Sequence, residues 1–143
     1  MYGYSVNSHP GPMNTSNEDR VCIVTNLNKT TIRSKQICFF GVYDGKNGSN
    51  KAEYYRDHFH IILYHDEYFM KDIEKAMKRS MILIEKNFIE DARFKDDAST
   101  TSFIIAIIVE KMLLLVEMGG QKAFLSTKLG EKIINPIQKP PQK

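Results

Sequence analysis

The chain has 143 residues, of which 42% are hydrophobic and 26% are charged, and its formal net charge is +3. This length suits one domain with a substantial core, and the composition is that of an ordinary globular protein. Lysine and arginine alternate with aspartate and glutamate along most of the chain, so the basic stripe typical of nucleic-acid binders is missing. We therefore expect one domain and no nucleic-acid partner.

The two cysteines, Cys22 and Cys38, both lie in apolar segments with strand character. Without a CxxC or Cys/His spacing they indicate neither a disulfide framework nor a zinc site, so we expect buried free thiols in a reducing compartment. The N-terminus lacks the basic and apolar regions of a signal peptide. The apolar segment 103–116 is short and carries Glu110 and Lys111 near its centre, which excludes a membrane span. We expect an intracellular protein, cytoplasmic or nuclear, with no membrane partner.

The first regular elements are two strands. Residues 21–25 are β-branched and alternate weakly, which predicts a strand, and residues 26–35 form a polar turn. Residues 36–43 predict a second strand that ends abruptly at Asp44 and Gly45. The two strands are expected to form a hairpin.

Two amphipathic helices are predicted next. Asn50 and Glu53 resemble a capping box that opens a helix to about Tyr64. A second helix is predicted near residues 70–87, where apolar side chains recur at helical spacing and charged ones cover the opposite face. Its apolar stripe consists of Ile73, Ala76, Met77, Ser80, Met81, Ile84 and Phe88. The methionines in this stripe indicate core packing.

Three further strands are predicted at residues 101–109, 112–118 and 122–126, and Gly119-Gly120 provides the second turn of this meander. From residue 128 the apolar pattern decays, and the prolines that follow predict a disordered tail rich in proline and lysine at residues 131–143. Two strands, two helices and a meander predict an α+β fold, with the helices on one face of an antiparallel sheet.

Acidic side chains stand at the ends of the first two strands. Glu18 and Asp19 precede the first strand, and Asp44 follows the second. Hard cations such as Mg²⁺ and Mn²⁺ prefer oxygen ligands, and Gly45 would let the chain turn and expose its carbonyl group. The pattern indicates a metal site; solvated or capping acidic residues at turns are the alternative interpretation.

Five short motifs occur in a fixed order. They are Asn-Glu-Asp-Arg at 17–20, Phe-Gly-Val-Tyr-Asp-Gly at 40–45, Ala-x-Tyr at 52–54, Asp-Ala-Ser-Thr-Thr at 97–101 and Glu-Met-Gly-Gly-Gln-Lys-Ala-Phe-Leu at 117–125. This ordered set resembles the protein phosphatase 2C (PP2C) family of metal-dependent Ser/Thr phosphatases. The last two motifs are similar to the family's Gly-Ser-Thr-Ala and Asn-x-Gly-Asp-Ser-Arg-Ala segments. The resemblance covers roughly residues 4–129, which implies a partial PP2C-like domain over residues 1–130.

The resemblance also implies an architecture and a site. The fold would be the N-terminal portion of a β-sandwich flanked by antiparallel helices, with a two-metal hydrolytic centre at one end of the sheets. By resemblance, Asp44 would bridge the metals and Gly45 would offer its carbonyl oxygen. Glu18, with Asp19 beside it, would hold a metal directly or through water. The implied cofactor is Mg²⁺ or Mn²⁺, and the implied partners are phosphoproteins.

Several positions depart from the family pattern in the direction of lost chemistry. The family's histidine after Asp-Gly is Lys46 here, which is a poor acid at neutral pH and would repel a cation. The family's phosphate-binding arginine is Asn14, which cannot form a charged bidentate pair, and the Asp of the Gly-Asp-Ser-Arg segment is Gly120. No aspartate follows Asp97, although the family draws two more metal ligands from its C-terminal half.

Three hypotheses follow. The first is a truncated PP2C-like protein without phosphatase activity, a pseudophosphatase with one weak Mg²⁺ or Mn²⁺ site at most. The second is a binding module that competes with intact relatives for partners or pairs its strands with a complementary protein chain. The third is residual Mg²⁺- or Mn²⁺-dependent protein Ser/Thr phosphatase activity that uses Glu18, Asp19 and Asp44, with or without a partner chain.

Overall fold

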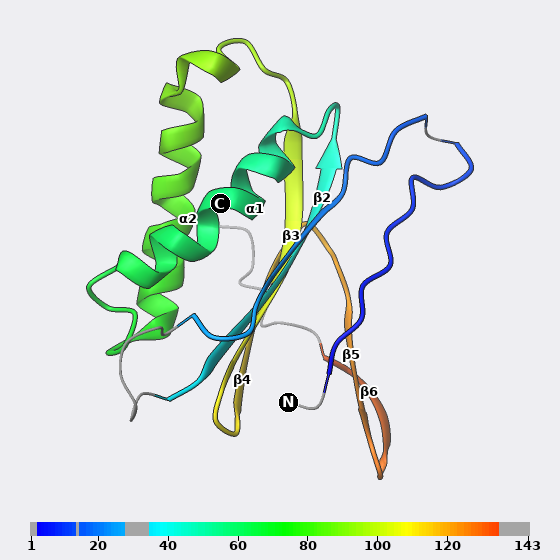
Figure 1. Cartoon of the computed structure of the whole chain (residues 1–143), viewed down its shortest axis with the longest axis vertical. Coiled ribbons are helices and arrows are strands. Elements are labelled where there is room, and N and C mark those ends of the chain that lie inside the picture. The colour runs from blue at the N-terminus through cyan, green and yellow to red at the C-terminus, as the bar shows by residue number, and fades with distance from the viewer. Residues whose placement is uncertain (1–2, 14, 28–34, 135–143) are drawn as a thin grey trace, which may run out of the picture.

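The computed structural model describes residues 3–13, 15–27 and 35–134 (Figure 1). In chain order, its elements are β1 (Arg20–Val24), β2 (Ile37–Lys46), α1 (Asn50–His65), α2 (Ile73–Glu90), the short 3-10 helix η1 (Ala92–Phe94), β3 (Thr100–Val109), β4 (Met112–Met118), β5 (Ala123–Thr127) and β6 (Gly130–Ile134). Strands β1 to β4 form one sheet in that order, and β5 pairs with β6 in a separate two-stranded sheet. All of these strand pairs are antiparallel. The predicted α+β class is confirmed.

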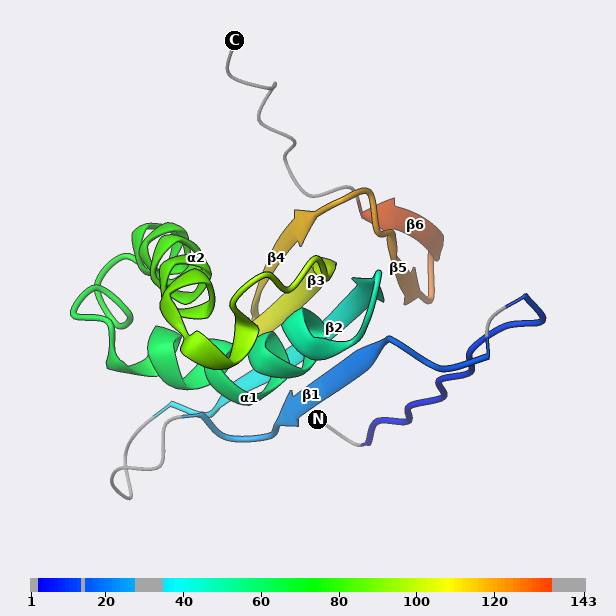
Figure 2. The same ribbon diagram turned by 90° about the horizontal axis from the view of Figure 1, so that it is seen from above.

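The molecule is layered around the four-stranded sheet. Both helices lie on one side of it, whereas the β5–β6 hairpin and the N-terminal segment of residues 3–13 lie on the other (Figures 1 and 2). Helix α1 packs directly on β1, β2 and β3, and α2 packs mainly on α1. The core therefore lies between the sheet and α1.

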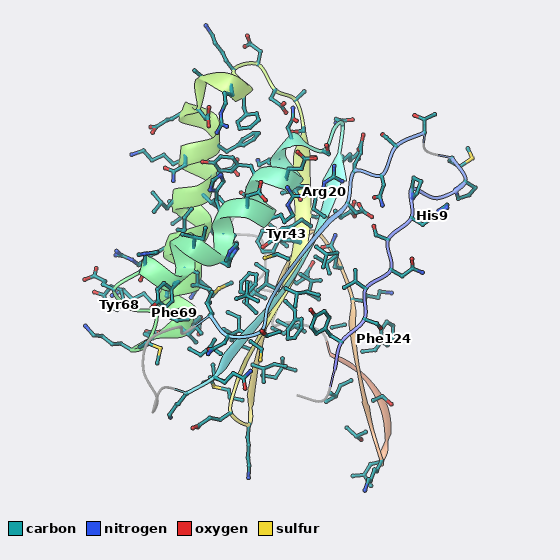
Figure 3. The ribbon with its side chains drawn as sticks, viewed as in Figure 1. His9, Arg20, Tyr43, Tyr68, Phe69 and Phe124 are labelled. Atoms are coloured by element: carbon teal, nitrogen blue, oxygen red, sulfur yellow. The ribbon has the colours of Figure 1, made fainter. Side chains whose placement is uncertain are left out.

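Strand alternation gives the sheet two distinct faces, because successive side chains point to opposite sides. The inner face, which is turned toward α1, is buried and includes Ile37, Phe39, Tyr43, Phe103, Ile105 and Ile107. The outer face includes the buried Cys38, but its other apolar residues are half-buried or exposed: Phe40, Val42, Ile104, Ala106, Ile108, Leu113 and Leu115. The ring of Tyr43 points from the sheet toward the helices, where it contacts Tyr55 of α1 (Figure 3).

Helix α1 spans nearly the predicted residues, but the predicted capping box is wrong. The N-cap is Ser49, and its side chain makes no capping hydrogen bond. The Asn50 side chain instead donates to the carboxylate of Asp97 at 2.7 Å, and Glu53 accepts hydrogen bonds from Arg20. The two residues of the expected box are therefore used for tertiary contacts.

Helix α2 begins slightly later than predicted because Asp72 caps it. The Asp72 side chain accepts a hydrogen bond from the backbone N–H of Lys75 at 3.0 Å. The predicted apolar stripe is largely buried against α1, with Ala76, Met77, Ser80, Ile84 and Phe88 as its buried members. Within the described part of the chain, no helix combines the length and the apolar character that crossing a bilayer requires.

The predicted meander is only partly correct. Strands β3 and β4 form the expected hairpin, but β5 leaves the sheet and pairs with β6. Strand β6 occupies Gly130–Ile134, so the prediction of a disordered tail is wrong for residues 131–134. Residues 135–143 lie outside the described residues, as does most of the predicted turn at 26–35. The expected domain boundary at residue 130 stays a prediction.

Candidate functional site

The acidic end of β2 is not a turn. Asp44 and Gly45 lie inside β2, which continues to Lys46 and pairs with β3 to its last residue. The chain turns at Asn47 and Gly48 instead, whose φ angles are 60° and 112°. The prediction that the strand ends before Asp44, and that Gly45 makes the turn, is wrong.

Gly45 is needed for a different reason, which is the close approach of another segment. A Cβ atom at this position would overlap the carbonyl oxygen of Glu18. The Glu18 carboxylate reaches past this contact and accepts a hydrogen bond from the backbone N–H of Gly48 at 3.1 Å. Glu18 thus ties the segment before β1 to the turn after β2.

Asp19 and Asp44 form a carboxylate pair. Burial raises the pKa of Asp19 most, and the charge of Asp44 and a side-chain hydrogen bond between the two groups raise it further. The backbone N–H of Gly45 and the positive charge of Arg20 act on this pKa in the opposite direction. Since two adjacent carboxylates repel each other unless a cation or a proton lies between them, this pair is the part of the site that suits a metal ion.

Arg20 fixes the segment that carries these acids. Its guanidinium group donates to the carbonyl oxygens of Asn17 at 2.8 Å and Asp19 at 2.7 Å. The same group donates through Nε to the carboxylate of Glu53 at 3.1 Å, and this hydrogen bond lowers the pKa of Glu53. Arg20, which is labelled in Figure 3, therefore links β1 to α1. Its hydrogen bonds to Asn17 and Asp19 also fix the backbone segment that precedes β1.

Two polar residues that the sequence did not single out complete the site. Gln121, which follows the β4–β5 glycines, donates from its side-chain amide to Ser102 Oγ and to Asp44 Oδ2, the latter at 3.4 Å. Ser102 stands opposite Asp44 in the register of β2 and β3. The sequence signal that could have identified Gln121 was its place in the motif at residues 117–125, which resembles the PP2C family.

The predicted ligands come together only in part. Across residues 3–13, 15–27 and 35–134, no three or more His, Cys, Asp or Glu side chains are arranged to hold a metal ion. Glu18 is engaged with a backbone N–H, and Asp19 is close enough to Asp44 for the charge of Asp44 to help raise the Asp19 pKa. The carboxylates of this pair match what one hard cation can use, because Mg²⁺ commonly takes one or two carboxylates and keeps several waters. The roles of all four residues as ligands stay predictions.

The substituted positions do not restore the missing chemistry. Lys46 is exposed at the end of β2 and, two residues after Asp44, points to the same face of the sheet. Gly120 has a positive φ of 88° and offers only its backbone N–H, which donates to the carboxylate of Glu117. Asn14 lies outside the described residues.

Comparison with known sequences gives consistent matches. The family model of protein phosphatase 2C matches residues 5–140. Protein phosphatase 2C homolog 2 of Aspergillus fumigatus is 28% identical over 113 residues, which cover 78% of this chain and 26% of that protein. Probable protein phosphatase 2C 52 of Oryza sativa subsp. japonica is 33% identical over 110 residues, which cover 75% of this chain and 22% of that protein. The chain spans less than a third of the length of these relatives.

Solved structures match the fold. A Caenorhabditis elegans sex-determining protein superposes with a TM-score of 0.73 at 15% identity, covering 90% of this chain and 33% of that one. The serine-threonine phosphatase 2C from Toxoplasma gondii superposes with a TM-score of 0.69 at 15% identity, covering 85% of this chain and 45% of that one. The fold is thus shared with PP2C structures, and the family model covers nearly the whole sequence. The chain belongs to the protein phosphatase 2C family.

Proposed function

We propose that this chain, on its own, is a non-catalytic member of the PP2C family that keeps one weak site for Mg²⁺ or Mn²⁺. The observation that carries the proposal is that, among the described residues, no three or more His, Cys, Asp or Glu side chains are arranged to hold a metal ion, and that Glu18 is directed to a backbone N–H. Hydrolysis at a two-metal centre requires enough carboxylates to hold both ions about 3.5–4 Å apart. Two carboxylates do not meet that requirement.

The residues for one ion can be named. Asp19 and Asp44 would hold it, and the carbonyl oxygen of Gly45 is a further candidate ligand. A bound divalent ion at such a site polarises a phosphoryl oxygen and makes a bound water more acidic. Arg20 and Glu18 keep the two acidic segments in place through backbone contacts.

The nature of residue 46 also supports the absence of turnover. A phosphatase needs an acid that protonates the leaving group, and this is most effective when its pKa lies near the working pH. The family's histidine has that property, whereas a lysine holds its proton at neutral pH. Lys46 is also exposed to solvent.

An activity assay tests the proposal directly. The purified chain, with Mn²⁺ or Mg²⁺ added, should leave p-nitrophenyl phosphate and a phosphothreonine peptide unhydrolysed. The matched control is Asp44→Ala, which should give the same background rate as the unaltered chain. Metal-dependent turnover that disappears in Asp44→Ala would instead establish the residual phosphatase activity considered above.

A further inference from the structure

The β4–β5 turn is built to lie unusually close to β3. Gly119 and Gly120 both have positive φ angles, 106° and 88°. A Cβ atom on Gly119 would overlap the side chain of Ser102, so only glycine permits this approach. The backbone N–H of Gly120 donates to the carboxylate of Glu117 and closes the turn. The turn therefore holds the residue that follows it against the acidic end of β2.

That residue is Gln121, and its amide lies against Asp44 and Ser102. The Nε2 atom donates to Ser102 Oγ and to Asp44 Oδ2, at 3.4 Å from the latter. The Oε1 atom is buried and has no hydrogen-bond partner among the described residues. The amide is thus held through its donor side alone, and its N–H groups bring partial positive charge to a carboxylate oxygen that a metal ion would use.

We propose that Gln121 is an internal competitor for divalent cations at the Asp19–Asp44 pair. In the structure its amide donates to Asp44, and the amide has to move away before an ion can take that oxygen. The proposal rests on the single cation site of the proposed function and adds a reason for its weakness. Because the contact is long and therefore weak, breaking it costs little free energy. This cost lowers the affinity for the ion without abolishing binding.

The test is a calorimetric titration of the full chain with Mn²⁺, at fixed pH and ionic strength. Gln121→Ala should bind Mn²⁺ about three- to tenfold more tightly, the range expected when one competing hydrogen bond is removed. Gln121→Glu should bind still more tightly, because it replaces the competing donor with a third carboxylate. The matched control is Gln36→Ala, whose side chain donates to the carbonyl oxygen of Thr25 at 2.9 Å and should leave the affinity unchanged.

A second measurement does not depend on removing the side chain. In ¹⁵N–¹H spectra of the unaltered chain, the side-chain NH₂ signals of Gln121 should shift and saturate as Mg²⁺ is added. The corresponding signals of Gln36 should stay in place. Circular dichroism of each variant confirms that the fold is intact before the titrations are compared.

The outcomes separate this proposal from the proposed function. Unchanged or weaker Mn²⁺ binding by Gln121→Ala, with binding retained by the unaltered chain, overturns the role of Gln121 and leaves the cation site standing. Absence of binding in all variants, including Gln121→Glu, overturns both the competitor role and the single cation site. Phosphatase turnover by the unaltered chain contradicts the absence of activity and leaves the effect of Gln121 on affinity to be read from the titrations.

Discussion

The two faces of the four-stranded sheet are both apolar, but only one of them is sealed. On the inner face, Phe39, Tyr43 and Ile105 are 0% exposed beneath α1. On the outer face, Val42 and Leu113 are each 42% exposed. Figure 2 shows the reason: α1 and α2 lie together on one side, whereas on the other side the described residues contribute only the β5–β6 hairpin and the N-terminal segment.

The difference shows that an alternating apolar pattern in a strand does not by itself mean that the face is buried. The N-terminal segment does reach the outer face, where the ring of Tyr4 meets that of Phe40 edge-on with centroids 6.4 Å apart. Tyr4 is nevertheless 59% exposed, so this contact covers little of the face. Apolar surface left open in this way is typical of a face that another layer or another chain covers. The inner face should accordingly carry most of the stability.

The largest expected effect comes from comparing two adjacent isoleucines of β3. Ile105 is 0% exposed on the inner face, so Ile105→Ala should lower the free energy of unfolding by about 2–5 kcal/mol through lost burial and a cavity. Ile104 lies next to it on the outer face and is only half-buried. Ile104→Ala should lower the free energy of unfolding by about 1 kcal/mol or less. Urea denaturation followed by circular dichroism measures both values.

The same two variants can also contradict the expected difference in stability between the two faces. If Ile104→Ala destabilises the chain as much as Ile105→Ala, the outer face is buried in solution. The β5–β6 hairpin and the N-terminal segment would then not be its only cover. Sedimentation of the two variants alongside the parent chain would then show whether a second copy provides the cover.

Much of this architecture follows from sequence alone, because strand alternation and helical spacing depend on local side-chain periodicity. The apolar stripe of α2 and the acids beside the first two strands were found in this way. The roles of Gly45 and Glu18 were not, because they depend on the backbone of one segment passing against another. The position of Gln121 depends in turn on how closely the β4–β5 turn approaches β3, which no periodicity encodes.

The separation of β5 from the sheet has a similar explanation. Two strands joined by a short turn with glycine normally pair with each other, so the sequence predicts that β4 and β5 are neighbours. The positive φ angles of Gly119 and Gly120 instead direct the chain away from the edge of the sheet. Since glycine permits many turn geometries, its presence marks the turn without specifying where the next strand goes.

An intermediate effect is expected in the helix layer, where a polar link joins α2 to α1. The Glu85 carboxylate accepts hydrogen bonds from Lys51 Nζ at 2.7 Å and from the buried Tyr55 hydroxyl group at 2.6 Å. Glu85→Ala leaves that hydroxyl group without its acceptor and should lower the free energy of unfolding by about 1–2 kcal/mol. The Glu85 side chain is 43% exposed, which keeps the value in the lower part of the usual range. Thermal denaturation of the variant measures the change.

The control for this prediction is an exposed ion pair on α2. Glu74 pairs with Lys78 at 2.6 Å, and their side chains are 68% and 50% exposed, so Glu74→Ala should change stability by about 0.5 kcal/mol or less. Burial raises the pKa of Glu85, but the hydrogen bonds from Lys51 and Tyr55 outweigh it and lower this pKa below 4.5. The stabilisation by Glu85 is therefore present above pH 4.5 and is lost as the pH falls through the lowered pKa. Equal losses for the two variants at pH 7 would contradict the distinct role of Glu85.

The smallest effect concerns the charged end of the outer face, and it has the opposite sign. The pKa of Asp19 is raised above 3.8 in the folded chain, so protonated Asp19 favours folding below pH 3.8 and this benefit is lost as the pH rises through the raised pKa. Asp19→Asn should therefore raise the melting temperature by roughly 1–3 °C at pH 7 in the presence of a chelator, and the gain should shrink toward pH 3. Asp96→Asn, in an exposed turn, is the matched control for the loss of one carboxylate. A lower melting temperature for Asp19→Asn at pH 7 would contradict this prediction. It would mean that the Gly45 N–H and Arg20 stabilise the Asp19 carboxylate more than Asp44 repels it. The two carboxylates would then not need a cation between them.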